Sequence, residues 1–204
     1  MYSPPLFRES RSEVLWEIVR EHPLATLLST RDGEMDCTHL PMFLDTSTQT
    51  LRAHMARANE HWQRLDGESA LAILHGPEHY ISPSWYPSKA EHGKVVPTWN
   101  YVAVHVRGRI TVHEDTDFLL KNVTELTDHN ERRLGTDWKV SDAPEEFIRG
   151  QARAIVGIEM AIESIEGKFK LSQNRAPQDR AAVVGQLESL ATPTSLEMAR
   201  LMKG

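Results

Sequence analysis

The sequence contains a single cysteine, Cys37, among its 204 residues. A lone cysteine excludes an internal disulfide framework and suits a reducing cytosol. Long apolar runs are also missing. No window approaches the roughly 18 apolar residues of a membrane-spanning helix, and the N-terminal residues lack the charged and apolar regions of a signal peptide. These absences predict a soluble protein in the cytoplasm with no membrane partner.

Several short motifs that mark common enzyme classes are absent. The patterns GxGxxG, GxxxxGK[ST], GxSxG and HExxH do not occur. Nucleotide binding by a glycine loop and hydrolysis by a nucleophile elbow are therefore disfavoured. His75 and His79 are four residues apart, but a Gly-Pro pair separates them, so they do not share a helix face. Because no Cys-x-x-Cys pair is present either, we expect no metal site.

Positively charged residues are also fewer than negatively charged ones. The chain has 23 Lys and Arg residues against 29 Asp and Glu residues, a formal net charge of −6. The long-range field therefore repels nucleic acid and anionic lipid, and direct DNA binding would need a local basic patch. The contents of 40% hydrophobic and 25% charged residues are ordinary for a globular protein that buries a core.

What the sequence does contain is a series of strand patterns joined by short turns. Strands are expected at 24–30, 35–45, 50–56, 70–76, 101–114 and 154–171, and helices at 10–23, 58–65, 116–134, 143–154 and in the tail from 177. A doubly wound parallel sheet needs a helix after almost every strand, and most of those helices are missing. We therefore predict a mainly β fold with peripheral helices, in which one antiparallel, Greek-key-like barrel domain spans 1–204 and a helical extension begins at about 177.

Two prolines, Pro83 and Pro97, lie close to the predicted strands, each beside a hydroxyl residue and near a tryptophan. Proline has no N–H to donate to a strand ladder and is tolerated at strand ends, edges and bulges. We therefore expect both prolines at strand ends, where neighbouring side chains can turn into a cleft.

Aromatic, hydroxyl and amide side chains gather at these strand ends. They lie in the segments HMARAN, ISPSWY, VPTWNY and KFKLSQNR. Arg57, with backbone N–H groups at a strand end, suits a phosphate, and aromatics with amides suit a planar, hydrogen-bonding ligand. Trp85 and Trp99 are equally typical of a dimer interface, so a ligand site and an interface both stay open.

The order of the motifs MYSPPLF, THLP, HMARAN, YISPSWY, VPTWNY and KLSQNR resembles the PaiB family. That family is described as FMN-binding negative transcriptional regulators within the FMN-binding split-barrel superfamily. The resemblance runs from residue 1 to about residue 187 of this chain. It implies an FMN-binding split β-barrel that forms a homodimer, with the cofactor in clefts between the subunits.

The resemblance also implies a set of cofactor-binding residues. One subunit would hold the FMN phosphate and ring edge near its early strands, and the second subunit would complete the cleft. The candidates are Thr38, His39, Leu40, His54, Arg57 and Asn59 from the first subunit, and Ser82, Trp85, Thr98, Trp99, Asn100 and Gln173 from the second. Arg57 is the strongest single candidate, and no catalytic residue is assigned.

Three functions follow from this resemblance. The first is a flavin-dependent sensor or regulatory module of the type that represses sporulation and degradative-enzyme genes. The second is an FMN-dependent oxidoreductase or a haem-handling oxygenase on the same fold. The third is a dimer that has lost its cofactor and acts as an interaction module. No helix-turn-helix pattern is evident, so direct DNA contact stays open.

Overall fold

The structure is a computed structural model that describes residues 1–204, and the chain divides into two compact units. Unit 1 comprises Met1–Leu15, His75–Val104 and Glu166–Gly204. Unit 2 comprises Trp16–Leu74 and His105–Ile165. The organisation of the whole chain as one domain stays a prediction.

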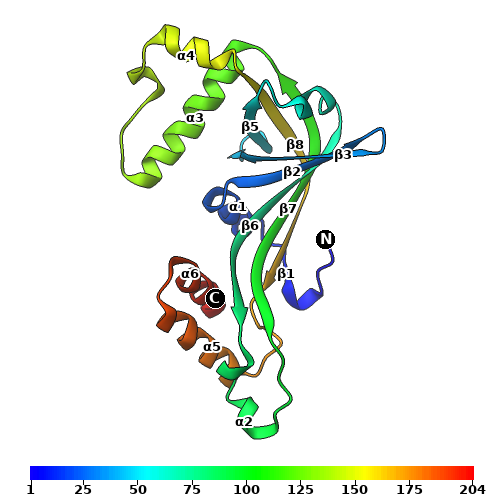
Figure 1. Cartoon of the computed structure of the whole chain (residues 1–204), viewed down its shortest axis with the longest axis vertical. Helices are drawn as coiled ribbons and strands as arrows, with labels where there is room; N and C mark the ends of the chain where they lie inside the picture. The colour runs from blue at the N-terminus through cyan, green and yellow to red at the C-terminus, as the bar shows by residue number, and fades with distance from the viewer. The chain divides into compact units, whose positions relative to one another are not determined.

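Eight strands are present, and all except β4 are labelled in Figure 1. They are β1 (Arg8–Glu9), β2 (Leu24–Arg31), β3 (Glu34–Pro41), β4 (Phe43–Asp45), β5 (Thr50–Ala56), β6 (Ser69–Ile81), β7 (Thr98–His113) and β8 (Ile155–Lys170). They pair in the order β3-β2-β6-β7-β8-β5-β4, and β1 pairs with β8. The register is antiparallel between β1 and β8, β2 and β3, β2 and β6, β4 and β5, and β5 and β8. The predicted antiparallel β fold is confirmed.

The helices lie mostly where the sequence predicts them. They are α1 (Ser12–Glu21), α2 (Ser88–His92), α3 (Thr116–Leu134), α4 (Glu145–Ala152), α5 (Pro177–Leu190) and α6 (Pro193–Lys203). Short 3-10 turns are η1 (Pro5–Phe7), η2 (Glu60–Arg64), η3 (Pro83–Trp85) and η4 (Val140–Asp142). The short helix α2 lies between Pro83 and Pro97, where the sequence patterns predict no helix. No helix is both long enough and apolar enough to cross a membrane.

Both prolines mark strand ends. β6 ends at Ile81, and Pro83 opens η3 directly after Ser82. Pro97 immediately precedes Thr98, the first residue of β7. The missing N–H of each proline therefore falls outside the ladder, as predicted.

The core of unit 2 lies on the inner face of its strands. Buried side chains alternate with less buried ones along most of β2, β6 and β7, as the period of two requires, whereas Thr50–Ala53 of β5 are all buried. A glycine sets the closest approach of two strands, because a Cβ on Gly108 of β7 would lie 2.1 Å from the carbonyl oxygen of Ala161 on β8. One buried cation, Arg52 on β5, pairs with Asp45 on β4 at 3.1 Å and with Glu125 on α3 at 2.6 Å. These ion pairs fix α3 to the sheet.

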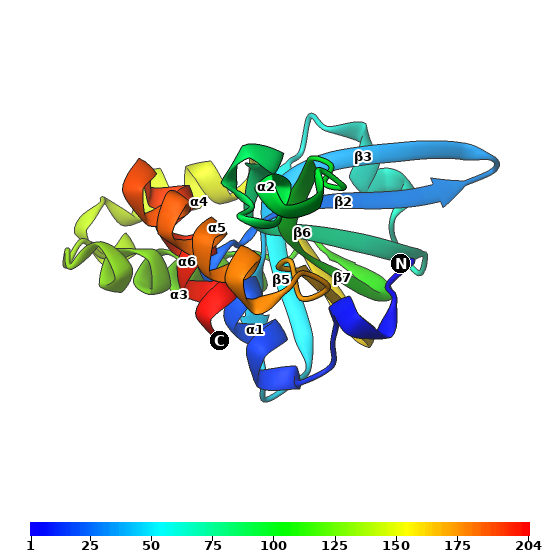
Figure 2. The ribbon, with the colours of Figure 1, turned by 90° about the horizontal axis from the view of Figure 1, so that it is seen from below.

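Unit 1 contains the two C-terminal helices, which lie side by side in both ribbon views (Figures 1 and 2). Val183 and Leu187 of α5 and Met198 and Met202 of α6 are buried between neighbouring elements. The uncapped start of α5 carries the buried carboxylate of Asp179, which accepts hydrogen bonds from Ser88. These contacts give unit 1 a small core of its own.

Candidate functional site

β2 and β3 form a hairpin (Figure 2). The side chains on its two faces differ. Consecutive residues of a strand point to opposite faces of a sheet. Thr38 is therefore on the inner face, where it is half-buried, and His39 is exposed on the outer face. The ring Nδ1 of His39 lies 3.0 Å from the hydroxyl of Thr26, its direct partner on β2. Because Leu40 is buried in the core, the THLP segment offers one polar side chain to each face and not a cluster.

A hydrogen-bond network joins the inner face of this hairpin to η2. His61 is 4% exposed, and its Nε2 lies 2.9 Å from the hydroxyl of Ser29. Its Nδ1 lies 2.8 Å from the hydroxyl of Thr38, which also accepts a hydrogen bond of 3.1 Å from Asn59. The structure thus brings the predicted residues Thr38 and Asn59 together. Sequence reasoning missed His61, although it follows Asn59 by two residues.

Asn59 also caps the short turn that follows it. Its side-chain oxygen accepts a hydrogen bond of 3.1 Å from the backbone N–H of His61. Because Asn59 already accepts from the backbone N–H of His61, this N–H is not free to bind a phosphate. Any anion near this corner must therefore be held mainly by side chains.

Arg57 lies at the end of β5 and has three partners of its own chain. Its guanidinium donates to the carbonyl oxygens of Arg153 at 3.1 Å and Ile155 at 3.3 Å, and it forms an ion pair with Glu114. It also lies over the ring of Trp62, 5.7 Å from the ring centroid. A guanidinium has more N–H donors than these three contacts use, so Arg57 keeps donors for a ligand while it ties β5 to β8.

His54 lies three residues before Arg57 on β5, and this strand contacts β3. Its Nδ1 is buried and makes no hydrogen bond within the chain. Burial lowers the pKa of His54, because the charged imidazolium loses hydration. A buried polar atom without a partner usually marks a missing ligand or water. The spare donors of Arg57 are compatible with a phosphate-bearing ligand at the end of β5, and the unsatisfied Nδ1 of His54 lies three residues earlier on the same strand.

The lowered pKa of His54 predicts a pH-dependent stability. The fold favours the neutral ring, whereas the unfolded chain protonates near pH 6.5. The contribution of His54 to the free energy of unfolding should therefore be fully present above about pH 6.5. It should fall as the pH drops further, until the lower pKa of the folded state is reached. One such group contributes at most about 1.4 kcal/mol per pH unit. His61 and His129, whose pKa values burial also lowers, act in the same direction.

Urea unfolding at about pH 7.5 and about pH 5.5 measures this effect. We expect His54→Gln to lose less stability on acidification than the wild type. His92→Gln, which replaces an exposed histidine of α2, should leave the pH dependence unchanged. An identical loss in wild type and His54→Gln would contradict the assignment of this proton to His54.

The other half of the predicted site belongs to unit 1. Asn100 is fully buried, and its side-chain N–H₂ donates to the sulfur of Met202 at 3.3 Å. Its side-chain oxygen accepts a hydrogen bond of 3.0 Å from Ser172. Both ends of the amide are therefore satisfied inside unit 1, and Asn100 supports the fold at this position.

Gln173 is satisfied in a similar way. Its side-chain oxygen accepts from the backbone N–H of Leu171 at 2.7 Å, and its N–H₂ donates to the carbonyl of Phe169 at 2.6 Å. The side chain thus fixes the turn after β8, where Ser172 has a positive φ of 59°. That turn determines where the basic residues on either side of it point.

The remaining predicted residues of unit 1 differ in exposure. Ser82 caps η3 by accepting from the N–H of Ser84 at 3.2 Å, and Trp85 is half-buried against His79. Trp99 is 51% exposed and meets Tyr80 edge to face at 5.9 Å. Trp99 is therefore the predicted aromatic with the most surface available to a ligand or a partner.

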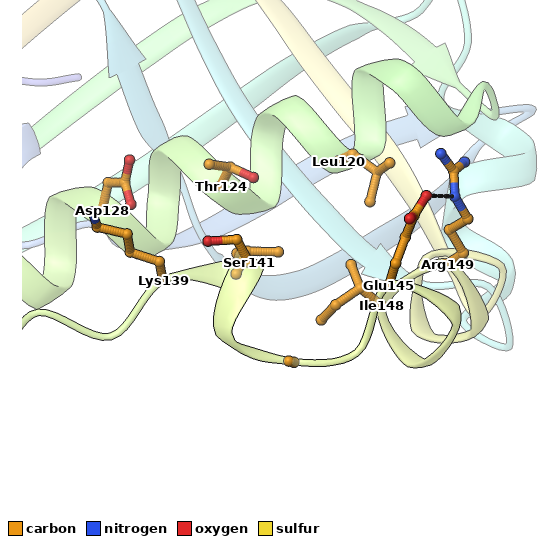
Figure 3. Close-up of a pocket in the computed structure, with 10 residues that line it drawn as sticks. Leu120, Thr124, Asp128, Lys139, Ser141, Glu145, Ile148 and Arg149 are labelled. Atoms are coloured by element: carbon orange, nitrogen blue, oxygen red, sulfur yellow. Dashed lines mark hydrogen bonds and ion pairs between the residues drawn. The ribbon is translucent and has the colours of Figure 1, made fainter.

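One hollow of unit 2 lies away from these residues. A cavity of about 510 Å³ lies between α3 and the segment from η4 to α4 (Figure 3). Figure 3 shows Leu120, Thr124 and Asp128 of α3 on one side and Lys139 and Ser141 on the other. Its charged groups are of both signs, and no residue of the predicted flavin site lines it. This cavity gives no support to a cofactor site at α3.

A second hollow lies on the outer face of the sheet, with a volume of about 470 Å³. Leu28, Met35 and Leu71 form its apolar floor. Arg107 and Glu163 lie at this hollow as well, and neither belongs to an ion pair within the chain. If two copies met at this face across a two-fold axis, the apolar floors would cover each other and the arginine of each copy could pair with the glutamate of the other.

Comparison with known proteins identifies similar chains. Residues 1–164 match the family model described as "Putative FMN-binding domain". The chain is 31% identical to "Protease synthase and sporulation protein PAI 2" of Bacillus subtilis (strain 168), with 100% of this chain and 97% of that protein covered.

Solved structures share the fold at low sequence identity. An FAD and haem binding protein from Mycobacterium smegmatis has a TM-score of 0.60 and 17% identity, covering 86% of this chain and 79% of that one. The flavocytochrome Anf3 from Azotobacter vinelandii has a TM-score of 0.58 and 13% identity, covering 86% and 75%. At these identities the likeness extends to the fold alone.

Proposed function

Because this chain belongs to the FMN-binding domain family, we propose that it acts as a flavin-dependent regulatory protein. The family match over residues 1–164 is the observation that carries this conclusion. The predicted resemblance to the PaiB family, the split-barrel fold and the FMN cofactor are confirmed by the comparisons. The regulatory role itself is a proposal, supported by the B. subtilis relative whose name refers to protease synthase and sporulation.

We place the phosphate of FMN near the end of β5 in unit 2. Arg57 would bind it with its spare guanidinium donors, and His54 would supply a ring nitrogen that the chain leaves unsatisfied. Asn59 and Thr38, bonded to each other, would hold η2 and β3 in position beside it. When bound, FMN supplies one- or two-electron redox chemistry.

We further propose a homodimer formed through the outer face of the sheet, where β2, β3, β6, β7 and β8 line the second hollow. This face carries Leu28, Met35 and Leu71 together with the unpaired Arg107 and Glu163. A second copy would cover the apolar floor and pair the two charges, which no segment of the same chain does. Residues of unit 1 with exposed surface, Trp99 above all, are proposed to complete the cleft from the second copy.

The negative charge of the chain favours regulation through the redox state of the flavin over nonspecific binding to DNA. The net charge of −6 repels a polyanion at long range. Reduction of a bound flavin changes its charge and hydrogen bonding, and a dimer whose cleft contains it can transmit that change to a partner protein.

The visible absorbance of the purified protein, before and after added FMN, tests the proposal. We expect a flavin spectrum and saturable FMN binding. Stopped-flow mixing with NADH or NADPH then separates a regulator, which need not turn over, from an oxidoreductase, which oxidises the nicotinamide repeatedly. A colourless protein that ignores added FMN would contradict flavin-dependent regulation altogether.

A further inference from the structure

Unit 1 contains a group of four neighbouring cations, none of which forms an ion pair with a carboxylate. The acids beside them in sequence already have other partners: Glu9 pairs with Arg11 at 2.6 Å, and Glu166 pairs with the N-terminal amine at 2.7 Å. The four cations are Arg8, Lys168, Lys170 and Arg175, here called the basic cluster. In a chain of net charge −6, four neighbouring cations without an acid are unexpected.

The strand register places like charges opposite each other. Arg8 of β1 is the direct cross-strand partner of Lys168 on β8. Like charges in this position destabilise a sheet. Lys168 and Lys170 lie on the same face of β8, because alternate residues of a strand share a face. Burial lowers the pKa of Lys170, and the charges of Lys168 and Arg175 lower it further. The fold therefore concentrates repelling charges in one place.

The contacts that hold these cations leave their charge intact. Lys170 donates to the hydroxyl of Thr98 and to the carbonyl of Trp99, the latter at 2.8 Å. Lys168 lies 5.3 Å from the ring centroid of Tyr101, and Arg175 lies 4.7 Å from that of Tyr86. Neutral acceptors and aromatic faces orient a cation without neutralising it.

The turn that positions the cluster is held by side-chain hydrogen bonds. Ser172 adopts a left-handed backbone conformation, which is rare for a residue with a side chain. Its hydroxyl is bonded to the buried Asn100, and Gln173 closes the turn through two backbone hydrogen bonds. Backbone strain held by such contacts is typical of binding sites.

Taken together, these features describe a site prepared for a polyanion. We propose that the basic cluster binds a phosphorylated ligand of the nucleotide type, with the phosphates at Lys168, Lys170 and Arg175 and the base on the exposed ring of Trp99. The site is built from residues of unit 1 alone, and Trp99 is the one residue that it shares with the flavin cleft proposed above. The same chemistry would accept the phosphate of a free nucleotide or that of FMN.

Binding of inorganic pyrophosphate and of ADP, measured by calorimetry at low ionic strength, tests this site. The wild type should bind both. The double variant Lys168→Gln/Lys170→Gln should bind each at least about tenfold more weakly, because it loses charge-assisted hydrogen bonds. Lys203→Gln is the matched control, since Lys203 is already paired with Glu188 and its loss should change neither affinity.

Trp99→Leu distinguishes the contribution of the base to binding from that of the phosphates. It should weaken ADP binding and leave pyrophosphate binding unchanged, because only ADP carries a base that can stack. Absence of pyrophosphate binding by the wild type, or an equal loss in the double variant and in Lys203→Gln, would overturn the proposal. The proposal would also be overturned if the double variant bound pyrophosphate and ADP as tightly as the wild type and lost affinity only for duplex DNA.

Competition between FMN and pyrophosphate identifies the source of the phosphate. Mutual exclusion, with both affinities lowered by Lys168→Gln/Lys170→Gln, assigns the basic cluster to the phosphate of FMN. Simultaneous binding assigns it to a second, nucleotide-type ligand. If FMN does not bind at all while pyrophosphate does, the proposed flavin function fails and the anion site still stands.

Discussion

Arg57→Ala is expected to weaken FMN binding about 10- to 150-fold and to leave riboflavin binding nearly unchanged. The factor corresponds to about 1.5–3 kcal/mol for hydrogen bonds to a charged group. Riboflavin has the same ring system but no phosphate, so the ratio of the two affinities isolates the phosphate contact. Flavin fluorescence quenching measures both constants on the same protein.

The same substitution should also lower the stability of unit 2. Arg57 donates to the carbonyls of Arg153 and Ile155, and its removal takes these two hydrogen bonds away from the junction of β5 and β8. Loss of such contacts costs about 1–3 kcal/mol of the free energy of unfolding. Urea unfolding without flavin measures this structural part separately from the loss of phosphate binding.

Arg109→Ala serves as the matched control. Arg109 is an exposed arginine of β7 in the same unit, and it donates to one carbonyl, that of Gly67, at 2.7 Å. We expect a small loss of stability and no change in the ratio of FMN to riboflavin affinity. If Arg57→Ala weakens both flavins equally, Arg57 is a structural residue and another group holds the phosphate.

Local patterns in the sequence predict the fold well because they arise from neighbouring residues. The period of two in β7 and the helical period of α3 depend on residues within one element. Asp115 accepts from the N–H of Phe118 at the start of α3, a cap contact between residues three positions apart. The two prolines mark strand ends for an equally local reason, the missing N–H.

The direction in which a polar side chain points depends on distant partners, and here sequence reasoning was weaker. Asn100 and Gln173 look like ligand-binding amides in the motifs VPTWNY and KLSQNR. In the structure both are satisfied by their own chain, Asn100 through Met202, which is 102 residues away. The segment KFKLSQNR did signal a basic site, but Arg8 joins it only through the register of β1 with β8.

Substitution of Met35 by glutamate is expected to abolish the proposed homodimer. Met35 is 74% exposed in the single chain and lies beside Leu28 and Leu71 at the outer face of the sheet. A second copy would bury it, and an unpaired charge buried in an apolar interface costs at least about 3 kcal/mol, more than a hundredfold in association. Light scattering during size-exclusion chromatography should give a dimer mass for the wild type and a monomer mass for Met35→Glu.

Leu134→Glu separates this effect from a general response to added charge. Leu134, the last residue of α3, is 75% exposed, so the two variants replace equally exposed apolar side chains of unit 2 with the same carboxylate. Leu134→Glu should remain a dimer, and circular dichroism should show both variants folded, because an exposed substitution changes stability by only about 0.5 kcal/mol. A monomeric wild type, or a dimeric Met35→Glu, would contradict the proposed interface. If Met35→Glu is a folded monomer that also binds FMN more weakly, the second copy contributes to the flavin cleft, and the exposed Trp99 is then the first residue to test for that contribution.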